Sequence, residues 1–94
     1  MIKDVLITKL DVIDAPGGNV MHGMKETSIG YSGFGEAYFS QVDKGIIKAW
    51  KRHKNMTLNL IVPVGKIKFV LFDDRDESNV RFQEIIISRD NSCR

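Results

Sequence analysis

The clearest candidates for chemistry lie in a basic run, Lys48–Lys54, with the sequence Lys-Ala-Trp-Lys-Arg-His-Lys. Lys51 and His53 stand two positions apart, so on a β-strand their side chains would share one face. Arg52 would point to the other face, and the cationic cluster as a whole could attract a diphosphate. The alternative is a solvated strand end, in which Lys51 extends into water and His53 is a partly exposed structural residue.

Glu36 and Tyr38 form a second pair with the same two-residue spacing. Both side chains could reach a nucleotide base, and the alternative is a cross-strand structural role. Trp50 would point away from Lys51 and His53 on a strand, which favours packing in a core or a dimer over base stacking.

The elements that must carry these residues are typical of short β-strands. Runs rich in Val, Ile, Leu and Phe alternate with polar residues, and Gly, Pro, Asn and Asp separate the runs. The predicted strands cover residues 3–13, 20–25, 36–42, 46–53, 57–62, 67–72 and 80–88. The predicted turns and loops cover 14–19, 26–35, 43–45, 54–56, 64–66 and 73–79, with a polar tail at 89–94. This succession of about seven or eight strands without a helical period predicts an all-β sandwich or barrel.

Length and composition are those of a small globular domain. The 94 residues fit one domain, 1–94, with a thin core. Lys and Arg total 14 against 12 Asp and Glu, and the two signs are interleaved, so we expect no nucleic-acid partner. Cys93 is the only cysteine, which excludes an intrachain disulfide and favours a cytoplasmic setting. Because no leader or apolar run of membrane-spanning length is seen, no membrane partner is expected.

The spacing around the basic run resembles the first motif of the cupin family, Gly-(five residues)-His-any-His-(three or four)-Glu-(six)-Gly. The motif positions are taken here by Gly45, Lys51, His53, Thr57 or Leu58, and Gly65. The resemblance implies a barrel, in which residues two apart on one strand project into the interior together. Since Lys51 and Thr57 replace expected ligands and a lone histidine does not hold a transition metal, we expect no metal and no cofactor.

Within the cupins, the chain is similar to the dTDP-4-dehydrorhamnose 3,5-epimerase family and its relatives in sugar-nucleotide ketoisomerisation. Gly45–Lys51 resembles the family pattern Gly-Val-Leu-Arg-Gly-Leu-His, and Trp50–His53 resembles the Trp-His-Arg-His of some relatives. Val64–Ile67 resembles a turn between strands of the family, and Phe72–Arg75 resembles its strand ending in an acidic-arginine pair. The resemblance covers Asp14–Asn91.

The resemblance implies a cupin-like jelly roll, an antiparallel β-sandwich or barrel, shortened at its C-terminal end relative to the family. It also implies proton abstraction beside the ketone of a dTDP-4-keto-6-deoxyhexose and reprotonation from the other face. In that scheme His53 is the base, Lys51 stabilises the enolate or a phosphate, and Arg52 contacts a phosphate. Glu36 and Tyr38 are then candidates for binding the substrate's nucleotide.

Several positions depart from the family pattern. Lys51 stands where the epimerases have a histidine base, and an amine with the ordinary lysine pKa, about 10.4, is a poor base at neutral pH. Leu58 lies near the position of the family lysine that stabilises the enolate, and the family's acid tyrosine falls beyond the matched strands. A second hypothesis is therefore a non-catalytic cupin-fold binding or scaffold protein. We also expect a homodimer, because an incomplete sheet leaves edges that need pairing.

Overall fold

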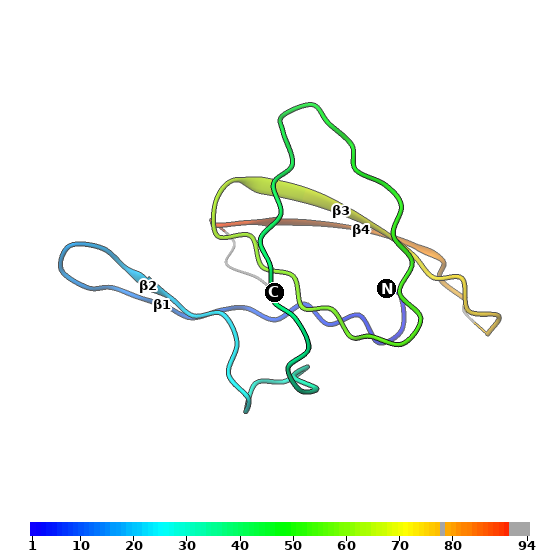
Figure 1. Ribbon diagram of the computed structural model, residues 1–94, viewed down its shortest axis with the longest axis horizontal. Coiled ribbons are helices and arrows are strands. Elements are labelled where there is room, and N and C mark those ends of the chain that lie inside the picture. Colours follow the sequence, from blue (N-terminus) through cyan, green and yellow to red (C-terminus); the bar gives the residue numbers. More distant parts are fainter. Residues whose placement is uncertain (78, 91–94) are drawn as a thin grey trace.

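The computed structural model describes residues 1–77 and 79–90. Ser78, in the predicted 73–79 loop, and 91–94, the end of the predicted tail with Cys93, lie outside the described residues. The described residues form four strands and no helix (Figure 1). The strands are β1 (Val12–Ile13), β2 (Val20–Met21), β3 (Lys66–Phe72) and β4 (Phe82–Ser88). The described residues are thus compatible with a small all-β fold, and their two separate two-stranded sheets do not close into a jelly roll or barrel.

The longest ordered element is the antiparallel pair of β3 and β4. In β3, Lys-Ile-Lys-Phe-Val-Leu-Phe alternates strictly, so Ile67, Phe69 and Leu71 share the half-buried face. On that face Ile67 lies opposite Ile87, and Phe69 opposite Ile85. This pair corresponds to the strands predicted over 67–72 and 80–88.

The pair β1 and β2 is a short ribbon that projects from the rest of the chain (Figure 1). Its turn is closed by a hydrogen bond from the Gly18 amide to the Ala15 carbonyl, 3.1 Å, and Gly17 adopts a φ of +85° that favours glycine. The His22 amide donates to the Asp11 carbonyl at 2.8 Å and continues the pairing. The predicted strands 3–13 and 20–25 are thus formed only around this turn.

The strands predicted over 36–42, 46–53 and 57–62 are not formed. Residues 32–61, which we call the arch, are all described, and their one backbone–backbone hydrogen bond runs from the Ile46 amide to the Asp43 carbonyl, 3.0 Å. That bond confirms the predicted turn at 43–45. The prediction of strands failed because alternation says which face a residue would occupy, whereas a strand also needs a neighbouring strand for its amides and carbonyls.

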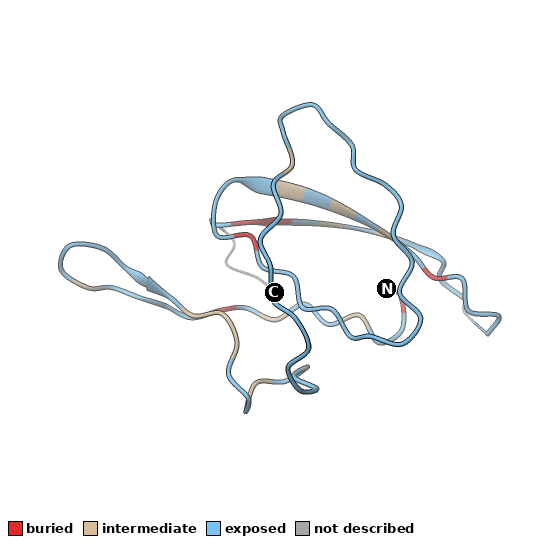
Figure 2. Ribbon diagram, in the orientation of Figure 1, coloured by how far each residue is buried: buried red, intermediate tan, exposed pale blue. Residues whose placement is uncertain are grey.

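The core is small. The buried apolar residues are Ile2, Leu10, Val62 and Ile87 (Figure 2). The solvent-accessible surface is 8175 Å², whereas a folded monomer of 10.7 kDa exposes about 5500 Å². The radius of gyration is 14.7 Å, against about 12.4 Å for a compact domain of this length. The chain therefore leaves much apolar surface in contact with solvent.

Candidate functional site

All five residues that the sequence singles out for chemistry lie on the arch, which includes the long open loop at the top of Figure 1. The five, Glu36, Tyr38, Lys51, Arg52 and His53, are exposed (Figure 2). Lys51 and His53 sit on a backbone that is not part of a sheet, so the strand geometry that would place them on one face is absent here. The site is consequently open to solvent on the described surface.

Arg52 is the candidate that the structure ties to another element. Its Nε lies 2.8 Å from Oδ2 of Asp74, just beyond the end of β3. Both side chains are well exposed, at 66% and 46%, so solvent screens this ion pair and its contribution to stability is small. In this structure the pair brings the later part of the arch next to the end of β3.

His53 has a sulfur neighbour. Its Nδ1 lies 3.1 Å from Sδ of Met56. A thioether is a weak hydrogen-bond acceptor, whereas a carboxylate would orient the imidazole and stabilise its protonated form. The described residues provide no carboxylate to His53 and no hydrogen bond or ion pair to Lys51. The imidazole is accessible to a ligand, but no neighbouring carboxylate of the described chain orients it.

Lys48 has a structural role that the sequence did not reveal. Its Nζ donates to the Gln41 carbonyl at 2.6 Å and to Oγ of Ser40 at 3.3 Å. These bonds link the two sides of the 43–45 turn of the arch. No comparable bond holds Glu36 or Tyr38 within the described chain, and Tyr38 is 63% exposed. The cation predicted to help attract a diphosphate is thus engaged within the arch itself.

Two open cavities lie away from the arch candidates. The first has a volume of about 520 Å³ and the second about 570 Å³. The first is lined by Thr8, Lys9, Leu10, Asp11, His22, Gly23, Met24, Lys25, Thr27, Ser28 and Ile29. The second is lined by Met21, Pro63, Val64, Gly65, Lys66, Ser88, Arg89 and Asp90. His22, which the sequence gave no chemical role, therefore borders a cavity, and the five candidates line neither one.

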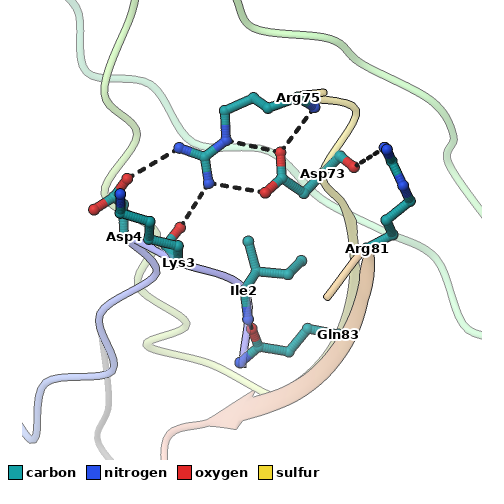
Figure 3. A network of polar contacts seen from close by, with 7 residues as sticks. All are labelled: Ile2, Lys3, Asp4, Asp73, Arg75, Arg81 and Gln83. Carbon is teal, nitrogen blue, oxygen red and sulfur yellow. Dashed lines mark hydrogen bonds and ion pairs between the residues drawn. The ribbon is translucent and has the colours of Figure 1, made fainter. Parts of the chain in front are cut away.

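The densest polar cluster surrounds Arg75 (Figure 3). Its Nε and Nη2 donate to the two carboxylate oxygens of Asp73, each at 2.8 Å, and its Nη1 lies 2.9 Å from Oδ2 of Asp4. Nη2 also donates to the Lys3 carbonyl at 2.9 Å. The hydrogen bonds to Asp73 and then Asp4 raise the pKa of Arg75 above its usual value, so the guanidinium stays charged throughout the ordinary pH range.

This cluster joins the N-terminus to the hairpin. Asp73 has a side chain only 5% exposed, and its carbonyl accepts from Nη1 of Arg81 at 3.1 Å. Nearby, the Ile2 amide donates to Oε1 of Gln83 at 2.9 Å (Figure 3). Asp73 and Arg75 therefore serve a structural role here, joining the N-terminal residues to the hairpin. The sequence motif alone could not show whether this pair was structural or contacted a ligand.

No family model, curated protein or solved structure matches this chain. Among residues 1–77 and 79–90, no grouping of three or more His, Cys, Asp or Glu side chains is suited to a metal ion. The same part of the chain contains no helix of the length and apolar character that crossing a bilayer requires.

Proposed function

We propose that this chain is a protein of the sugar-nucleotide epimerase or ketoisomerase type, acting on a dTDP-4-keto-6-deoxyhexose or a close analogue. The proposal includes a cupin-like jelly roll as the fold of the assembled protein and a cytoplasmic setting. One contact carries it: the ion pair between Arg52 and Asp74 brings together the two stretches, Trp50–His53 and Phe72–Arg75, on which the resemblance depends.

The proposed chemistry is proton transfer without a cofactor. The imidazole of His53 takes the proton from the carbon beside the ketone, and the electrons of that C–H bond move to the carbonyl oxygen to give an enolate. The ammonium of Lys51 stabilises the enolate charge or a phosphate. Reprotonation of the carbon from the opposite face gives the epimer. Arg52 contacts the diphosphate, and Glu36 and Tyr38 contact the nucleotide.

The test is uptake of solvent deuterium by dTDP-4-keto-6-deoxyglucose, read by mass spectrometry. We expect uptake above a protein-free control, because each enolate returns a proton from solvent. His53→Ala should abolish it, whereas His22→Ala, a histidine at the separate 520 Å³ cavity, should leave it unchanged. Equal uptake by the parent and a folded His53→Ala variant would remove His53 from the mechanism, and absence of uptake by the parent would reject catalysis on this substrate.

A second candidate function is binding of a nucleotide sugar without turnover. It is favoured by the thioether, rather than a carboxylate, beside His53 and by the position of Lys51 and His53 outside both cavities. Saturable binding of dTDP that Arg52→Ala weakens, together with no deuterium uptake, would establish this function. Deuterium uptake that depends on His53 would exclude it.

A further inference from the structure

The outer edge of β3 has a defined set of unpaired backbone groups. At one end of the hairpin the Arg89 amide donates to the Gly65 carbonyl at 3.3 Å, and at the other the Asp73 amide donates to the Arg81 carbonyl at 2.7 Å. Because hydrogen-bonded and non-hydrogen-bonded pairs alternate in an antiparallel ladder, the odd-numbered residues of β3 bond to β4. The amides and carbonyls of Lys66, Lys68, Val70 and Phe72 therefore point away from β4.

This edge has no strand beside it in the described chain, where β3 pairs with β4 alone. A row of outward amides and carbonyls seven residues long is a template for another strand. A sheet of only two strands is also marginally stable, and a third strand adds to its stability. The edge is thus a binding surface for an extended chain.

We propose that a second copy of this chain occupies the edge, with the two β3 strands antiparallel about a twofold axis at Phe69. The result is a continuous four-stranded sheet in the order β4, β3, β3, β4. In this register Lys66 of one copy lies opposite Phe72 of the other, and Lys68 lies opposite Val70. Every outward amide and carbonyl of β3 then finds a partner across the axis.

The side chains favour this register over its neighbours. On the half-buried face it places Phe69 against Phe69 and Ile67 against Leu71, so apolar residues meet. Sliding the strands by two residues one way places Lys68 directly opposite Lys68, and like charges in that position are unfavourable. Sliding them the other way leaves Lys66 without a strand partner.

The exposed area also fits a second copy. Each chain exposes about 2700 Å² more than a folded monomer of its mass should. Two copies together have roughly 5400 Å² of surplus surface spread over their whole length, which exceeds the area of about 2000 Å² or more that obligate homodimers bury. Exposed apolar residues lie on the hairpin itself, including Val70 at 42% and Phe72 at 48%.

The experiment combines light scattering with amide hydrogen exchange followed by NMR on the full chain. We expect a mass of twice the chain at tens of micromolar protein, with the amides of Lys66, Lys68, Val70 and Phe72 as protected as those of Ile67, Phe69 and Leu71. A monomer in which the even-numbered amides exchange freely would overturn the proposal. Protection of those amides in a monomer would also overturn it, since another part of the chain would then cover the edge. A dimer with free even-numbered amides would place the interface elsewhere and overturn it as well.

A variant at Val70 separates dimer formation from folding. Val70 lies opposite Glu84 within its own chain, so Val70→Lys adds a favourable pair there. Across the proposed axis the introduced lysine of each copy lies opposite Lys68 of the other copy, which gives two like-charge pairs. The dissociation constant of the dimer should therefore rise about tenfold. Val70→Thr, which is β-branched and uncharged, is the matched control and should leave the dimer intact. Equal dissociation constants for the two variants would exclude this register.

Discussion

At the scale of single residues, two adjacent carboxylates have opposite environments. The Asp73 side chain is 5% exposed and holds Arg75, whereas the Asp74 side chain is 46% exposed and pairs with exposed Arg52. Asp73→Asn removes the charge from the buried position but keeps the shape of the side chain. We expect it to lower the free energy of unfolding by about 1–3 kcal/mol, because Arg75 loses the buried one of its two carboxylate partners and an amide cannot accept at both positions.

The measurement is urea denaturation, with Asp74→Asn as the matched control. Solvent screens the exposed pair with Arg52, so the control should change the free energy of unfolding by about 0.5 kcal/mol or less. Equal losses in the two variants would show that the Arg75 cluster contributes no more to stability than a surface ion pair.

The residue types of the candidate site could be chosen from the sequence, but their partners could not. The basic run and the Asp73–Arg75 pair were both recognisable as charged motifs. Which carboxylate meets which arginine depends on the path of the chain: Arg75 reaches Asp4, far away in sequence, and Arg52 reaches Asp74. Likewise Lys48 donates to the Gln41 carbonyl, and the pattern of side chains in the sequence does not indicate which backbone carbonyl will accept a hydrogen bond.

At the scale of elements, the inner face of β4 depends on one well-buried side chain. Ile87 is 5% exposed and Ile86, its neighbour on the other face, is 53% exposed. Ile87→Val should lower the free energy of unfolding by about 0.5–1.5 kcal/mol, since it removes a methylene group from a packed position. Ile86→Val should cost about 0.5 kcal/mol or less.

Thermal and urea unfolding of the two valine variants would check this pair. Because both positions are isoleucine in the same strand, the comparison cancels the difference in β-propensity between the two residue types. A larger loss for Ile86→Val than for Ile87→Val would mean that the hairpin packs through its other face.

The hairpin was predictable because both of its strands are rich in β-branched and aromatic residues and one charged loop separates them. The charged residues between them form the connection, and β3 finds its partner without help from distant parts of the chain. The run 46–53 is even closer to 57–62, yet its large apolar residues are exposed, with Ile47 at 90% and Trp50 at 65%, and it forms no ladder. A short connection therefore did not ensure pairing: the pair that formed is the one that half-buries a continuous apolar face, Ile67, Phe69 and Leu71.

At the scale of the whole molecule, the chain buries less of itself than a folded domain of its size. From the same area relation it removes about 47% of its unfolded surface from water, where about 65% is usual. The buried apolar residues of the described chain, Ile2, Leu10, Val62 and Ile87, come from four separate stretches of the sequence. The arch, with every candidate residue, has neither a ladder nor a buried apolar side chain to hold it.

The measurement that tests this account most directly is hydrogen–deuterium exchange by mass spectrometry across the whole chain in dilute solution. The account predicts exchange over the arch close to that of an unfolded chain, because every arch amide except that of Ile46 lacks a backbone partner, and distinctly slower average exchange over 66–72 and 82–88. Protection of 46–53 and 57–62 equal to that of the hairpin in dilute solution would contradict it and would place those segments in a sheet of the single chain.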